Sequence, residues 1–199
     1  MRCLAAILLA VALVTTGLLR GQEREPVPVT TKAYHEVRKR LLTALAERMP
    51  EEYYNFKPTP EMQTFGDLVA HVTQHQERFC SEAMGQQYEV SGTGNQAASP
   101  RRPGGTVALP KSKTELVAAL EHSFAACEAA MDAVTEANAT ELIDGFGTRM
   151  SRLRILLGDL LHSSEEYGYL AVYLRLKGVV PPSSDPEFLK TLRPILSGR

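Results

Sequence analysis

The sequence lacks an excess of charge of either sign. Its 22 lysines and arginines are matched by 23 aspartates and glutamates, which gives a formal net charge of −1 at pH 7. No stretch combines clustered basic residues with interleaved aromatics, the pattern of a nucleic-acid-binding surface. We therefore expect no nucleic-acid partner. A chain of 199 residues with 44% apolar content is enough for one well-filled core, so we expect a single domain.

Long apolar runs are also missing, except at the N-terminus. After Arg2, residues 3–19 are apolar apart from Thr15, Thr16 and Gly17, which is typical of a secretory signal peptide. We expect residues 1–21 to be this signal, residues 22–30 a linker, and the mature protein to be exported, periplasmic or secreted, without a membrane anchor. No clear cleavage motif precedes residue 22, and the run is at the lower length limit for crossing a bilayer, so an uncleaved anchor is the alternative.

Cysteine is scarce. Of the three cysteines, Cys3 lies in the predicted signal, which leaves Cys80 and Cys127 in the mature chain. Both lie on apolar helical stripes, so they can meet where two helices pack. In an oxidising compartment such a pair forms a disulfide, whereas two small buried thiols are the equally weighted alternative.

The alternation typical of β-strands is almost absent. Apolar residues instead recur at intervals of three and four, the spacing of one helical face. Thr64 with Asp67 and Ser112 with Glu115 have the spacing of capping boxes. The pattern predicts helices at 31–49, 64–85, 112–134 and 149–177 and a short helix at 186–192. We therefore predict an all-α fold, a four-helix bundle over residues 31–199 with a short C-terminal helix.

A long loop separates the second and third predicted helices. Residues 86–111 are rich in Gly, Ser, Pro and polar residues and show no periodicity. Loops of this length in compact domains are either functional or disordered. One hypothesis is that the loop covers a site and that Arg101 and Arg102 bind an anionic substrate; the simpler interpretation is a solvated surface loop.

The fourth predicted helix is apolar around nearly its whole circumference, which predicts a central, well-covered element. A polar strip runs along it, formed by His162, Glu166, Tyr169 and Tyr173. A buried glutamate in such a strip needs a partner, and a metal ion or a histidine would serve. The two tyrosines either place a hydroxyl near a metal or belong to the core.

A metal site in a bundle draws its ligands from facing helices. The second predicted helix offers His71 and His75, which are four residues apart. Periodicity alone favours His75, because it lies nearer to the apolar stripe of that helix. This stripe comprises Phe65, Leu68, Val72 and Phe79.

Two segments carry a resemblance to a known family. "TFGDLVAHV" in the second helix and "LLHSSEEYGYLAVYLRLKGVVPPSS" in the fourth resemble the DinB-like superfamily of four-helix-bundle metalloproteins, over about residues 31–184. Members of that family carry one metal-binding histidine in the second helix and an H-x3-H pair in the fourth. The resemblance implies His71 and His162 as ligands, with Glu166 at the position of the third histidine, and leaves His75 as the second choice.

The resemblance implies a divalent metal ion as cofactor. Two histidines and one carboxylate suit zinc, and nickel, iron and manganese are the other candidates. The implied function is an exported metal-dependent enzyme, of the thiol-dependent transferase or hydrolase type, acting on a small-molecule substrate. The alternative is a non-catalytic binding or stress-related bundle in which the change to glutamate marks loss of the metal. A homodimer is compatible with either.

Overall fold

The structure is a computed structural model that describes residues 25–86, 88 and 112–197. The predicted signal peptide and most of the predicted loop, including Arg101 and Arg102, lie outside these ranges. None of the helices in the described ranges has the length and apolarity needed to cross a bilayer.

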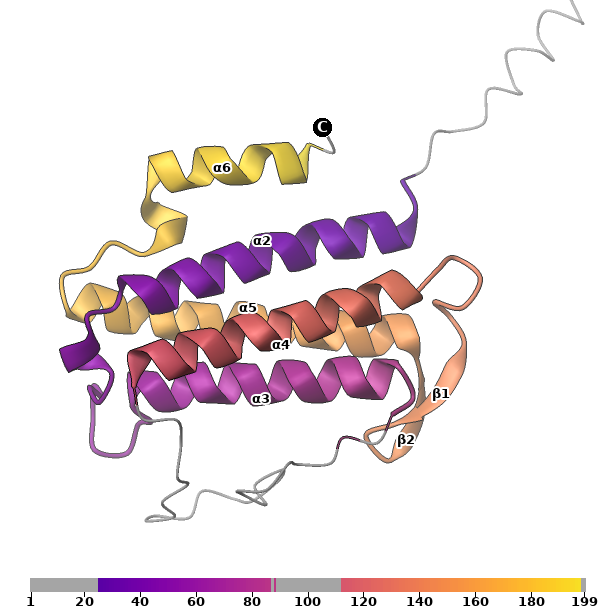
Figure 1. Ribbon diagram of the computed structural model, residues 1–199, viewed down its shortest axis with the longest axis horizontal. Coiled ribbons are helices and arrows are strands. Elements are labelled where there is room, and N and C mark those ends of the chain that lie inside the picture. Colours follow the sequence, from indigo (N-terminus) through magenta and orange to yellow (C-terminus); the bar gives the residue numbers. More distant parts are fainter. Residues whose placement is uncertain (1–24, 87, 89–111, 198–199) are drawn as a thin grey trace, which may run out of the picture.

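Four long helices form the body of the molecule, as the apolar spacing predicts (Figure 1). The α2 and α3 helices each pack against both α4 and α5. This confirms the all-α bundle. The bounds of the four helices are α2 Val27–Arg48, α3 Phe65–Ala83, α4 Lys113–Ala133 and α5 Arg152–Leu176.

Local signals set the ends of these helices. The Thr64 and Ser112 side chains accept hydrogen bonds from the backbone N–H groups of Asp67 and Glu115, and both capping boxes are complete. Gly85, the predicted stop of the second helix, has a φ of 73°, a backbone conformation that other residues adopt only at a cost.

The first helix begins earlier than the apolar spacing predicts. It starts at Val27, inside the segment that we expected to be a linker. Proline occurs in its first turn, where the fixed φ suits a helix and the missing N–H is not needed. The apolar spacing does not extend into this first turn, and therefore did not reveal it.

A small β-hairpin, which the apolar spacing did not predict, precedes α5. Strands β1 (Leu142–Gly145) and β2 (Thr148–Ser151) pair antiparallel, with Leu142 opposite Ser151. Phe146 and Gly147 connect them with positive φ values of 51° and 75°, as a tight hairpin turn requires. Four-residue strands are too short to show an alternating pattern.

The C-terminal segment returns along α2. After the short 3-10 helix Pro182–Ser184, α6 spans Pro186–Leu196 and packs against α2 (Figure 1). Another 3-10 helix, Glu51–Tyr53, follows α2. The predicted short terminal helix is therefore present, and it runs beyond the predicted end at residue 192.

The α5 helix is not covered all round, so that prediction was wrong. Leu161 is 73% exposed, and Leu157 and Val172 are also exposed. In a ring of four helices each member has neighbours on two sides only, and the outer face remains in solvent whatever its composition. Tyr34 on α2 is likewise exposed.

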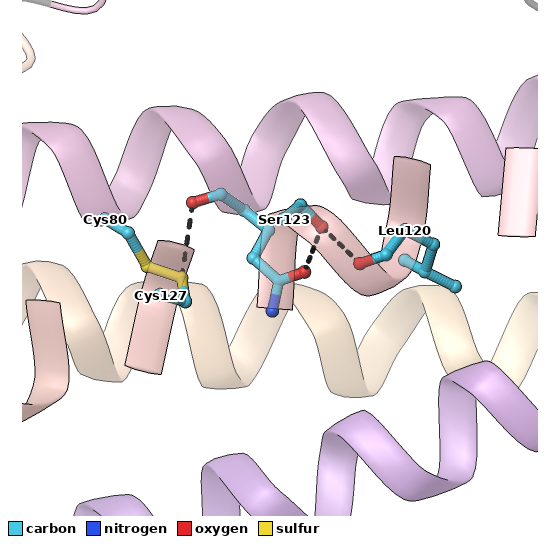
Figure 2. The surroundings of a disulfide bond; sticks show 5 residues. Cys80, Leu120, Ser123 and Cys127 are labelled. Atoms are coloured by element: carbon cyan, nitrogen blue, oxygen red, sulfur yellow. Dashed lines mark hydrogen bonds between the residues drawn. A yellow bond between two sulfur atoms is a disulfide. The ribbon is translucent and has the colours of Figure 1, made fainter. Parts of the chain in front are cut away.

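Cys80 and Cys127 form a disulfide between α3 and α4, with their Cα atoms 5.2 Å apart (Figure 2). The sequence left open whether these cysteines form a disulfide or remain two buried thiols, and the structure has the disulfide. It lies within a buried cluster at the hairpin end of the bundle, which includes Ala83, Met131 and Ile155. A larger cluster fills the remainder of the core.

Candidate metal centre

Three histidines and a glutamate converge at the interface of α3 and α5. His71 and His75 lie one turn apart on α3, and His162 and Glu166 lie one turn apart on α5. Residues four apart in a helix share a face, so two adjacent helices present two polar pairs to each other. The structure thus brings together His71, His162 and Glu166, and adds His75.

The side chains are close enough to act on one ion. The imidazole centroids are 4.2 Å apart for His71 and His75, 4.1 Å for His75 and His162, and 5.2 Å for His71 and His162. One nitrogen from each of the three rings lies within 4.8 Å of the other two. Glu166 Oε1 is 3.5 Å from His71 Nε2 and 3.9 Å from His162 Nε2.

The cluster is largely shielded but reaches the surface. The Glu166 side chain is 8% exposed, whereas that of His71 is 32% exposed. The buried atoms Nδ1 of His75, Nε2 of His162 and Oε2 of Glu166 have no hydrogen-bond partner among the described residues. Buried polar atoms are nearly always paired in proteins, so this concentration of unpaired donors and acceptors points to a ligand.

Burial keeps two of the imidazoles neutral at pH 7. The pKa of His75 is lowered to about 4, first by desolvation and then by the neighbouring rings of His162 and His71. Desolvation also lowers the pKa of His162, while Glu166 acts in the opposite direction. A neutral imidazole offers a nitrogen lone pair, which is the form that binds metal ions.

An aromatic side chain flanks the cluster at its hairpin end. The Phe79 ring lies 6.1 Å from that of His75 and is stacked at 6.4 Å on that of His162. It also contacts Phe146 in the hairpin turn, at 4.7 Å between centroids. Gly158 permits this position, because a Cβ atom there would lie 2.9 Å from Phe79 Cε1. The hairpin therefore supports one wall of the cluster.

The two tyrosines of the predicted strip do not complete it. Tyr173 is buried and its hydroxyl donates to the carbonyl oxygen of Gln63, at 2.8 Å. The Tyr169 side chain is exposed and its hydroxyl donates to Glu165. Tyr173 thus matches the alternative of a core residue with a paired hydroxyl, and Tyr169 belongs to the surface.

Sequence reasoning missed a second group of polar side chains in the core. His35 on α2 and Asp159 on α5 are both buried. The available signal was that Asp159 is the one charged residue among residues 155–161, which are otherwise Ile, Leu and Gly. His35 gave no comparable signal, because α2 is rich in polar residues.

Comparisons with known proteins agree with this architecture. A family model described as the DinB superfamily matches residues 33–164. Among solved structures, a DinB-like protein from Bacillus cereus has a TM-score of 0.58 and 16% identity, with 73% of this chain and 89% of that chain covered. A DinB-like protein from Bacillus subtilis has a TM-score of 0.55 and 18% identity, with 75% and 92% covered.

At these identities the two solved structures show a common fold and nothing more. No curated protein matched the chain. The family model alone covers well over half of the sequence, in the segment that holds His71, His75 and His162. The chain therefore belongs to the DinB superfamily.

Proposed function

We propose that this protein binds a divalent metal ion between α3 and α5, through His71, His162 and Glu166, and acts as an exported metal-dependent enzyme. One observation carries the proposal. The Glu166 carboxylate, although almost fully buried, lies within 4 Å of imidazole nitrogens from two different helices.

The separations fit a common ion. Two ligands at 2.0–2.1 Å from a tetrahedral zinc ion lie about 3.3 Å from each other. The distances of 3.5 Å and 3.9 Å from Glu166 Oε1 to His71 Nε2 and His162 Nε2 are only slightly larger. One nitrogen from each of His71, His75 and His162 also lies within 4.8 Å of the other two, so the four side chains border one region between the helices.

His75 lies beside these three ligands and is the second choice for the ligand from α3, so that three protein donors leave one position open for water. In the family pattern the third histidine stands where this chain has Glu166, so one imidazole is missing from α5. His75 supplies an imidazole from the facing helix, with its ring 4.1 Å from that of His162. Nitrogen and carboxylate donors suit zinc best, and nickel, iron and manganese also accept them.

A bound ion of this kind polarises a substrate oxygen or lowers the pKa of a bound water towards neutrality. The protein supplies the donors, the shielded wall at Phe79 and a more open side at His71. Thiol-dependent transfer or hydrolysis of a small molecule is the class of reaction that membership of the family favours. Fold alone does not fix a reaction, so the substrate has to be found by assay.

Export is the second part of the proposal. It is supported by the apolar segment after Arg2 and by the disulfide between Cys80 and Cys127. Disulfides persist in the periplasm and outside the cell and are rare in the cytosol. Fractionation of cells producing the full chain, together with N-terminal sequencing of the mature protein, tests export directly; full-length chain in the cytosol would contradict it.

The metal is tested by elemental analysis of protein purified without a histidine tag. We expect about one equivalent of zinc, nickel, iron or manganese, lost in His71→Ala and in His162→Ala. His122→Ala is the matched control, because His122 is an exposed histidine on α4. A parent protein that remains metal-free after incubation with each ion would favour the non-catalytic bundle instead.

A further inference from the structure

A second group of potential ligands lies in the centre of the bundle, apart from the candidate metal centre. It consists of His35 on α2, Cys127 on α4 and Asp159 on α5. The three residues are 3%, 0% and 1% exposed. One ligand atom from each lies within 4.8 Å of those of the other two. Three helices thus direct a nitrogen, a sulfur and an oxygen to one point in the core.

Two of these side chains lack well-formed hydrogen bonds. Both ring nitrogens of His35 and both carboxylate oxygens of Asp159 are buried without a hydrogen bond of good geometry among the described residues, although the Phe124 backbone lies near His35 and the Ser163 hydroxyl near Asp159. Burial raises the pKa of the Asp159 carboxyl to about 7, and the Ser163 hydroxyl offsets only part of this effect. Burial lowers the pKa of His35, which keeps its imidazole neutral. Unpaired polar groups in a core are costly, so a ligand for them is expected.

The third member is blocked in the oxidised protein. Cys127 is bonded to Cys80, and its sulfur lies 3.5 Å from the carbonyl oxygen of Gln76 (Figure 2). A disulfide sulfur is not a thiolate, and the thiolate is the form of cysteine that binds metals. The state of this one bond therefore decides whether the group has two ligands or three.

We propose that reduction of the Cys80–Cys127 disulfide creates a second metal site, in which a thiophilic divalent ion such as zinc binds to Cys127, His35 and Asp159. A dithiol reductant supplies two electrons and two protons, becomes a disulfide itself, and leaves Cys80 and Cys127 as thiols. The Cys127 thiol then releases its proton as the ion binds.

The charges of this site balance. A dication bound by one thiolate, one carboxylate and one neutral imidazole forms a complex without net charge. An uncharged complex avoids the large cost of placing an isolated charge in a medium of low dielectric constant. Cysteine, histidine and aspartate are each common zinc ligands.

The two cysteines provide a matched pair of variants. Cys80→Ser and Cys127→Ser both remove the disulfide, but only Cys80→Ser leaves the proposed ligand free. Cobalt(II) is the probe, because thiolate ligation gives it a charge-transfer band in the near ultraviolet. The candidate metal centre at His71 contains no cysteine, so a cobalt ion bound there gives no such band. The band therefore reports on the second site alone, and the two proposals can be tested independently.

We expect about one equivalent of cobalt with the thiolate band in Cys80→Ser without reductant, and in the parent protein only after reduction. Adding His35→Ala or Asp159→Asn to Cys80→Ser should weaken this binding at least tenfold, and Cys127→Ser should show no band. Cobalt should also raise the melting temperature of Cys80→Ser more than that of Cys127→Ser, in which only the candidate metal centre remains to bind it. Equal bands in the two serine variants, or no band in Cys80→Ser and in the reduced parent, would overturn the proposal.

Discussion

Glu166 Oε1 lies 3.5 Å from His71 Nε2, so a carboxylate on α5 contacts an imidazole on α3. The resemblance implies a histidine at the position of this glutamate. The contact shows that the carboxylate oxygen of Glu166 is directed at the facing helix.

Replacement of this glutamate tests its part in metal binding. Loss of a residue that only hydrogen-bonds to a metal ligand typically weakens metal binding by roughly 10–100-fold. We expect Glu166→Ala to weaken zinc binding by more than this, because it removes a direct ligand. Glu166→His restores the histidine pair of the family pattern and should retain binding. Competition with a chromophoric chelator measures both affinities. Wild-type affinity in Glu166→Ala would show that the carboxylate is not a ligand.

Two glycines of α5 give a matched comparison. A Cβ atom added at Gly168 would meet no atom within 4 Å, whereas a Cβ at Gly158 would lie 2.9 Å from Phe79 Cε1. Gly168→Ala should therefore raise the free energy of unfolding by about 0.5–1 kcal/mol, the helix preference of alanine over glycine, and leave metal affinity unchanged.

Gly158→Ala should stabilise the protein less, or destabilise it, because the Phe79 ring must move. Since this ring is stacked on that of His162, we also expect metal binding to weaken several-fold. Urea unfolding and chelator competition on both variants check these outcomes. Identical behaviour of the two variants would mean that Phe79 does not support the cluster.

The disulfide should contribute strongly to stability. Closing a loop with a sequence separation of 47 residues reduces the entropy of the unfolded chain by an amount worth about 4 kcal/mol in the chain-entropy model. We expect the Cys80→Ser/Cys127→Ser double variant to lose up to this free energy of unfolding. Urea unfolding with a chelator present excludes effects of metal. A loss below about 1 kcal/mol would show that the native bond provides little stabilisation.

Acid should loosen the attachment of α6. Hydrogen bonds from Arg48 and from the backbone N–H of Phe188 lower the pKa of Asp185, which caps α6. Because the folded pKa lies below the unfolded value of about 3.9, this stabilisation is fully present above that value. It is lost as the pH falls through the folded pKa.

Asp185→Asn retains a good N-cap residue but loses the charge that pairs with Arg48. The variant should be less stable than the parent at neutral pH, and the difference should shrink as the pH falls below about 3.9. Urea unfolding at several pH values measures it. A difference that does not change with pH would exclude an ionic contribution from Asp185.

Helix positions and fold class followed from local patterns. Thr64 with Asp67 and Ser112 with Glu115 cap their own helices, and such contacts depend only on residues within one turn. Apolar spacing likewise identifies the inward face of a helix before its partners are known. The short hairpin was not predicted, because four-residue strands are too short to show a recognisable alternation of apolar and polar residues.

The outer face of α5 shows where local patterns fail. Leu161 lies in a segment apolar on all sides, which predicts burial, yet it is 73% exposed. Burial depends on how many neighbours a helix has, and this number is a property of the whole bundle. Periodicity favoured His75 and the resemblance favoured His71, and in the structure both rings lie close to His162.

The sequence by itself determined the helices, their caps and the family, because spacing and capping act within a few residues. The resemblance implied His71, His162 and Glu166 as candidate ligands, and the structure brings these three side chains together. Only the tertiary structure decided that His75 joins them, that Cys80 and Cys127 are bonded, and that His35 meets Asp159 in the core. Each of these contacts spans two helices, and their relative rotation and depth are fixed by packing of the whole core.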